Sequence, residues 1–109
     1  MTIDFSQIPE QVVANFKGGE KELHKRAFSD GSVIIMLDRL VPGASIGVHT
    51  HADDCEIIYV LSGTATFLTP GGEETVPAGQ SHYCPKGGTH GLKNNGSDDL
   101  VFFAVVPKQ

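Results

Sequence analysis

Two stretches decide the fold of this chain: residues 43–63, GASIGVHTHADDCEIIYVLSG, and residues 79–94, GQSHYCPKGGTHGLKN. In a β-strand, side chains two positions apart point to the same face, so the two histidines of HTH can share one ion. Together the stretches supply three imidazoles and one carboxylate: His49, His51, Glu56 and His90. This donor set is common for a first-row divalent metal. We therefore expect these four side chains to hold one transition metal ion, and Mn, Fe, Co, Ni, Cu and Zn all suit the donors.

The rest of the chain is typical of an all-β protein. Glycine and proline recur throughout, and short runs rich in β-branched and aromatic residues lie between them. Many short strands separated by turn residues predict a β-sandwich or barrel. The expected strands are 12–16, 32–40, 46–51, 56–61, 64–69, 91–94 and 100–106, with a Pro-Gly-Gly turn at 70–72. Residues 3–15 are the one candidate for a short helix, capped by Asp4 or Ser6, and residues 1–109 are expected to form a single domain.

The two stretches resemble the two motifs of the cupin family, motif 1 at 43–63 and motif 2 at 79–94. The matching positions are Gly43, His49, His51, Glu56 and Gly63, then Gly79, Pro85, Gly87, His90 and Asn94. The resemblance implies a double-stranded β-helix, or jelly-roll barrel, with the metal inside its mouth. It also implies that the metal ligands are His49, His51, Glu56 and His90. The remaining alternative for these four residues is a barrel of the same fold that holds no metal.

Motif 2 has a second possible frame, because residues 71–82 also fit it as far as His82 but lack its asparagine. The complete frame is preferred, so His82 is not expected to be a primary ligand. It is interpreted as a barrel-wall or surface residue, and a place in the pocket or behind a ligand is the alternative. Either His82 with Cys84, or Ser81 with Tyr83, should face inward. Asn94 is interpreted as a turn residue without a chemical role.

Composition narrows the possible partners. The net charge is −5 and the eight lysines and arginines are mostly scattered, whereas a nucleic-acid-binding protein should show a basic face. The one basic cluster, at 21–26, is interpreted as a solvated or edge strand, with a grip on an anion as the alternative. No apolar run is long enough to cross a bilayer, and no secretory signal is visible, so a cytoplasmic location is expected. Cys55 and Cys84 are expected to be free thiols.

The sequence indicates function only coarsely. The resemblance allows a metal-dependent enzyme acting on a small oxygenated molecule, of dioxygenase, decarboxylase or isomerase type; a non-catalytic module that binds a sugar or small molecule is the alternative, and a pure scaffold a third possibility. Candidate acid–base groups are Asp53, Asp54, His82, Tyr83 and Glu56 itself, and no catalytic residue is assigned. The runs 33–37 and 101–106 are apolar on both faces, so a homodimer is expected to cover the outer face.

Overall fold

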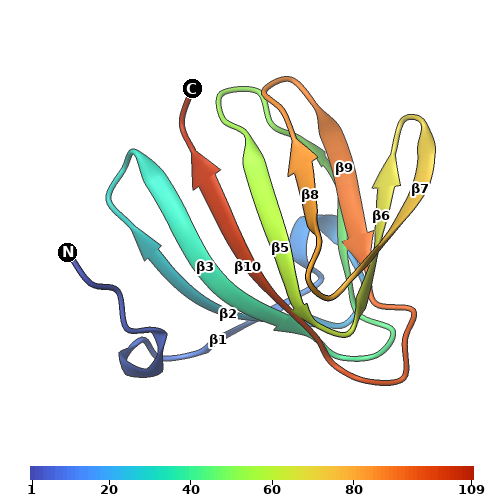
Figure 1. Ribbon diagram of the computed structural model, residues 1–109, viewed down its shortest axis with the longest axis horizontal. Coiled ribbons are helices and arrows are strands. Elements are labelled where there is room, and N and C mark those ends of the chain that lie inside the picture. Colours follow the sequence, from blue (N-terminus) through green and yellow to red (C-terminus); the bar gives the residue numbers. More distant parts are fainter.

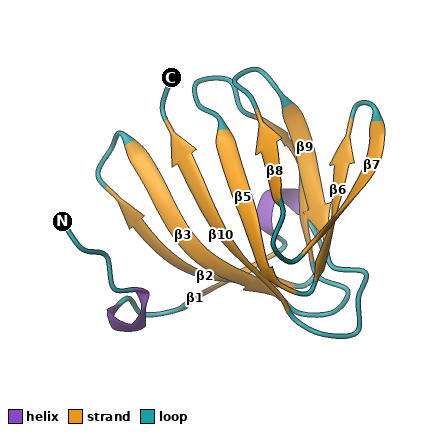
Figure 2. Ribbon diagram, in the orientation of Figure 1, coloured by secondary structure: helices purple, strands orange, loops and turns teal.

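The computed structural model describes all residues, 1–109, as ten strands and two short 3₁₀ turns. The elements are η1 (Phe5–Gln7), β1 (Gln11–Ala14), η2 (Phe16–Gly18), β2 (Glu22–Ser29), β3 (Val33–Leu40), β4 (Ser45–Thr50), β5 (Glu56–Ser62), β6 (Thr64–Thr69), β7 (Gly72–Pro77), β8 (Ser81–Cys84), β9 (Thr89–Lys93) and β10 (Leu100–Pro107). Figures 1 and 2 show these strands as two curved layers that face each other.

The strands form two antiparallel sheets. One sheet has the order β1-β2-β3-β10-β5-β8, and the other has the order β4-β9-β6-β7. Because β4 lies in the opposite sheet from β3 and β5, the chain crosses between the layers repeatedly as it advances. This winding is the double-stranded β-helix, so the expected jelly-roll architecture is confirmed.

Side-chain alternation places the core between the sheets. Every second residue of β10 is buried, starting from Leu100, as a strand with one face toward a core requires. The largest of the fully buried core side chains are Phe67 from one sheet and Phe102 from the other. The inward faces of both sheets therefore supply one continuous apolar core.

The expected strands are found, except that the one expected at 12–16 ends at Ala14 and Phe16 begins η2. The chain also forms β2, β7 and β8, which were not predicted with explicit bounds. The interpretation of 21–26 as an edge strand is wrong, because β2 pairs on both sides, with β1 and with β3. The predicted helix is a single 3₁₀ turn, η1, and Asp4 caps it by accepting a hydrogen bond from the Ser6 amide.

Two glycines let η2 lie directly against β4. A Cβ at Gly47 would fall 1.9 Å from the carbonyl oxygen of Lys17, and one at Gly19 would fall 2.1 Å from that of Ser45. Only residues without a side chain allow such an approach of two backbones. The contact fixes Phe16 and Lys17 above the space between the sheets, where they help to form the cavity described below.

The outer face of the six-stranded sheet is partly covered by the N-terminal segment. The ring of Phe5 meets that of Phe103 edge-on, with centroids 6.1 Å apart, and the Arg26 guanidinium donates hydrogen bonds to the carbonyls of Phe5 and Ile8. Farther along the same sheet, large apolar side chains on β5 and β8 remain exposed: Ile57, Tyr59, Leu61 and Tyr83. No helix is both long and apolar enough to span a bilayer.

Candidate metal centre

The backbone brings the two sequence stretches together at one end of the barrel. β4 pairs with β9 so that His49 lies opposite His90. Just beyond β4, the His51 amide donates to the Gly88 carbonyl at 2.9 Å, and the Gly87 amide donates to the His51 carbonyl at 2.6 Å. Gly87 adopts a φ of 82°, a conformation that favours glycine. These bonds fix the three histidines close together on neighbouring segments.

Glu56, the first residue of β5, completes the cluster from the opposite sheet. The four side chains each offer a donor atom, and these atoms lie within 4.8 Å of one another. Glu56 Oε1 is 3.0 Å from His90 Nε2 and 3.3 Å from His51 Nε2, and these two nitrogens are 3.1 Å apart. Neighbouring ligands at right angles on bonds of about 2.1 Å are about 3.0 Å apart. The spacing and chemistry of this donor cluster therefore fit a single divalent ion.

Each histidine of the cluster is oriented through its other ring nitrogen. His49 Nδ1–H donates to the Gly47 carbonyl at 2.7 Å, and His51 Nδ1–H donates to Asp54 Oδ1 at 2.6 Å. A bond of this kind fixes the tautomer and leaves Nε2 available as a ligand. The ring orientations therefore suit metal binding.

His90 is held by a longer chain of side chains. Its Nδ1 is 3.1 Å from His82 Nε2, and His82 Nδ1 is 3.0 Å from Glu74 Oε1. A carboxylate only accepts, so His82 donates from Nδ1 and its neutral ring accepts at Nε2 from His90. The ring of His82 also stacks on Phe67, with centroids 3.8 Å apart. The series Glu74–His82–His90 therefore aims Nε2 of His90 at the cluster.

The open alternatives for β8 are thereby resolved. His82 and Cys84 face inward, while Tyr83 is 58% exposed on the outer face. His82 is not a surface residue: it is only 5% exposed and lies directly behind His90. Alternation along β8 predicts which residues share a face. In a strand of four residues, however, it does not show which face points inward until the neighbouring strands are known. Both cysteines are free and buried, and burial raises the pKa of the Cys84 thiol.

Asn94 is structural, as interpreted from the sequence, but it reaches beyond its own turn. Its side-chain amide donates to the carbonyls of Leu40 and Asp98, and its oxygen accepts from the Gly96 amide, each at 2.9 Å. The Asn94 carbonyl accepts from the Gly43 amide. The end of motif 2 is therefore tied to the beginning of motif 1.

The electrostatics of the cluster favour a charged glutamate. Although burial alone would raise the pKa of Glu56, hydrogen bonds from His51 and His90 lower it to about 2. Contact with Glu56 raises the pKa of His51, and burial lowers that of His49. Since a metal needs Nε2 of each ring without its proton, binding an ion must release any proton shared between His51 and Glu56.

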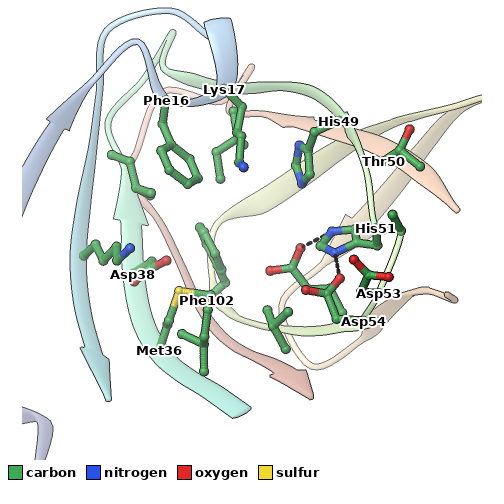
Figure 3. Close-up of a pocket in the computed structure, with 17 residues that line it drawn as sticks. Phe16, Lys17, Met36, Asp38, His49, Thr50, His51, Asp53, Asp54 and Phe102 are labelled. Carbon is green, nitrogen blue, oxygen red and sulfur yellow. Dashed lines mark hydrogen bonds and ion pairs between the residues drawn. The ribbon is translucent and has the colours of Figure 1, made fainter. Parts of the chain in front are cut away.

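A cavity of about 360 Å³ opens beside the cluster (Figure 3). His49, His51 and Glu56 lie along one wall, and apolar side chains such as Met36, Ile46 and Phe102 form much of the remainder. Of the candidate acid–base groups, Asp53 and Asp54 line this cavity, whereas His82 and Tyr83 do not.

Three charged residues that were not predicted as site residues also line the cavity: Lys17, Lys25 and Asp38. Lys25 belongs to the cluster interpreted as solvated, and its place in the cavity corrects that reading. Asp38 was missed because it lies in a run of apolar residues. Its signal was the strand period, which puts Asp38 on the same face as Met36 and Leu40, both of them buried.

The chain was compared with known proteins. Residues 36–106 match the family model described as "Cupin domain". A protein of Thermotoga maritima named "Oxalate-binding protein" is 31% identical over 112 aligned positions, which cover 97% of this chain and 93% of that one. A crystal structure of "a predicted oxalate decarboxylase" from the same organism covers 100% of both chains, with a TM-score of 0.92 and 28% identity. The "Beta-alanine degradation protein BauB" of Pseudomonas aeruginosa is 32% identical over 75 residues, 67% of this chain and 79% of that one.

Proposed function

Because this chain belongs to the cupin family, we propose that it holds one divalent transition metal ion on four ligands, and through that ion binds a small organic acid of the oxalate class. The ligands are His49, His51, Glu56 and His90. The observation that carries the proposal is the convergence of their four donor atoms from both sheets within 4.8 Å. Isolated histidines at a surface do not meet in this way with their opposite nitrogens already bonded.

The chemistry follows from the number of donors. Four protein ligands leave two positions of an octahedron open, and a bound ion there would supply Lewis acidity and a template for two ligand oxygens. Adjacent carboxylates, as in oxalate, present two oxygens at the right separation to occupy both positions. The relative named as an oxalate-binding protein supports this ligand class.

The binding site can be tested with the metal-free protein and with protein loaded with Mn²⁺ or Co²⁺. Calorimetry should give one metal per chain, with release of protons, and then one oxalate per chain only in the loaded form. The variant His90→Ala, compared with His24→Ala outside the cluster, should lose both events. Equal oxalate binding by the metal-free protein would refute the proposal.

A second candidate function is catalysis of the decarboxylase type. Asp53 favours it, because this residue lies in the cavity wall next to Asp54 and forms no ion pair. In such a reaction the C–C bond of the oxalate monoanion breaks, CO₂ leaves, and the electron pair that remains on the other carbon takes up the proton, giving formate. Asp53 would be the group that holds and delivers this proton. Formate release by the loaded protein, abolished in Asp53→Asn with oxalate affinity intact, would establish it; saturable binding without formate would leave the binding function alone.

We also propose a homodimer through the outer apolar patch, defined as Ile57, Tyr59, Leu61 and Tyr83. These side chains are each at least 40% exposed and lie on two paired strands. A contiguous apolar surface of this kind marks an interaction site. Light scattering should give about 23 kDa, twice the chain mass of 11.6 kDa, and Tyr59→Lys should halve it. The exposed Val12 on β1 gives a control, Val12→Lys, and a monomeric parent would contradict the proposal.

A further inference from the structure

The cavity has a second polar region, apart from the four donor atoms. Asp38 on β3 is 3% exposed, and its Oδ1 has no hydrogen-bond partner. Its cross-strand neighbour is Lys25 on β2, yet the two form no ion pair. Figure 3 shows Asp38 across the cavity from His51. A buried polar atom without a partner is costly, and Asp38 lines the cavity, so its carboxyl group can gain a partner from a ligand that enters the cavity.

Two ammonium groups also line the cavity. The Nζ atoms of Lys17 and Lys25 are each 5.6 Å from the centroid of the Phe16 ring, and all three residues line the cavity. Each ammonium therefore lies within cation–π range of the same ring, and neither forms an ion pair with a carboxylate. Lys17 has a φ of 56°, which is uncommon for any residue but glycine and has a conformational cost. Lys17 therefore adopts a costly backbone conformation at a position that lines the cavity.

We propose that Lys17, Lys25 and Asp38 form a distal subsite for a second carboxylate, so that the cavity takes a dicarboxylic acid whose 2-oxo or 2-hydroxy acid end binds the metal. This inference rests on the proposed function, since the metal anchors the near end. The two ammoniums attract the distal carboxylate, and the protonated Asp38 carboxyl donates its O–H to it. The apolar residues Met36 and Phe102 face the carbon chain between the two ends.

The size of the cavity supports a ligand longer than oxalate. A volume of about 360 Å³ lies in the range of roughly 300 to 1,000 Å³ that is usual for drug-sized molecules. Oxalate has only six non-hydrogen atoms, and its two carboxylates are directly bonded, so it fills the metal end alone. A dicarboxylate of about five carbons has a flexible chain to match the apolar wall and a second charge for the lysines.

The protonation of Asp38 agrees with this role. Burial raises the pKa of Asp38 to about 7, the Lys25 ammonium works against this rise, and the Glu56 carboxylate adds to it. Besides Lys17 and Lys25, the titratable residues that line the cavity with Asp38 are His49, His51, Asp53, Asp54 and Glu56. A neutral Asp38 donates a hydrogen bond to a carboxylate, while an ionised one repels it. Dicarboxylate affinity should therefore fall as the pH rises through about 7.

The test uses the metal-loaded full chain and three ligands: oxalate, 2-oxoglutarate and 2-oxopentanoate. The last two share the metal-binding end and the chain, and only 2-oxoglutarate has the distal carboxylate. We expect 2-oxoglutarate to bind roughly 10- to 100-fold more tightly, as for charge-assisted hydrogen bonds. Lys25→Met, Lys17→Met and Asp38→Leu should each reduce this ratio, with oxalate affinity unchanged as evidence of an intact fold and metal site. Lys93→Met, which removes an ammonium paired to Glu73 outside the cavity, should leave the ratio unchanged.

The variant Asp38→Asn distinguishes a role of Asp38 as a hydrogen-bond donor from a general effect of substitution on packing. The amide still donates, so the preference for 2-oxoglutarate should remain, but its dependence on pH near 7 should disappear. Equal affinities of the two 2-oxo acids for the parent protein, with both bound, would overturn the subsite and leave the proposed function standing. Failure of all three ligands, oxalate included, would instead overturn the proposed function and the subsite with it.

Discussion

Two carboxyl groups are buried in the wall of one cavity, and their surroundings shift their pKa values in opposite directions. Glu56 is 8% exposed and Asp38 is 3% exposed. Glu56 receives hydrogen bonds from two histidines, and its pKa is lowered to about 2. Asp38 Oδ1 has no partner, and burial raises its pKa to about 7. Burial alone therefore does not decide the charge of a carboxyl group; the donors that face it do.

The two carboxyl groups therefore differ in whether their hydrogen-bonding needs are met in the protein without a ligand. The region of Glu56 is complete without a ligand, because Glu56 Oε1 has partners in His51 Nε2 at 3.3 Å and His90 Nε2 at 3.0 Å. The region of Asp38 is incomplete, and the unsatisfied oxygen reduces the stability of the empty protein. Such a cost is common where a side chain is kept for a ligand.

The largest expected effect is loss of metal on changing a donor next to Glu56. His51→Ala or His90→Ala removes one of four ligands and leaves Glu56 buried with fewer donors. Elemental analysis after dialysis should fall from one metal per chain to nearly none, while circular dichroism still reports the β-barrel. Metal content equal to that of the parent would mean that the four residues do not form the site.

The second prediction concerns the stability that the protein loses when the buried Asp38 carboxyl group ionises. Its folded pKa is raised from 3.8 to about 7, so the folded state loses stability as the pH rises from about 3.8 to 7. Asp38→Asn removes the ionisable group and should stabilise the metal-free protein at pH 8 by as much as about 4 kcal/mol, at 1.36 kcal/mol per pKa unit. Urea denaturation at pH 8 measures this gain, and the exposed Asp98→Asn provides the control. A gain that is the same at pH 3.5 would not come from ionisation.

Glu56 should show the opposite pH dependence. Its folded pKa is lowered from 4.5 to about 2, so its stabilising contribution is complete above pH 4.5 and is lost as the pH falls toward 2. In the metal-free protein this loss should reach about 3 kcal/mol at most. Over this pH range, the free energy of unfolding of Glu56→Gln should depend less on pH than that of the parent, as measured by urea denaturation at each pH. The unfolding free energy of the exposed control Glu20→Gln should change with pH as that of the parent does. The same pH dependence in Glu56→Gln and Glu20→Gln would contradict the assignment.

The smallest effect is expected behind His90. His82→Leu removes the acceptor for His90 Nδ1–H, so metal affinity should fall by roughly 10- to 100-fold, as is usual for groups that orient a metal-binding histidine. Glu74→Gln keeps a hydrogen-bonding partner for His82 and should have a smaller effect. Competition with a metal-sensitive dye measures both, and Glu73→Gln on the same strand is the control. The visible spectrum of bound Co²⁺ should shift in His82→Leu if the ring of His90 turns, a change that lower stability alone does not produce.

Local patterns in the sequence predicted much of this arrangement. The spacing of His49 and His51 placed both on one face of a strand, and the glycines and prolines marked most of the turns. Strand pairing was harder to predict. The charges of β2 suggested an edge, whereas β1 covers that edge through four paired residues, and nothing in the charges of β2 indicates that the chain returns there.

The sequence by itself determined the fold class and the shared face of His49 and His51, because these depend on alternation and spacing over a few residues. The resemblance to the cupin motifs implied that Glu56 and His90 join this pair. Only the tertiary structure decided that His82 supports His90, that Lys17 and Lys25 line the cavity, and that Asp38 Oδ1 has no partner. Each of these depends on side chains from strands distant in the chain that pack against one another across two sheets. A partner is present or absent only once those strands are in place, and the charge of a buried group follows from its partners.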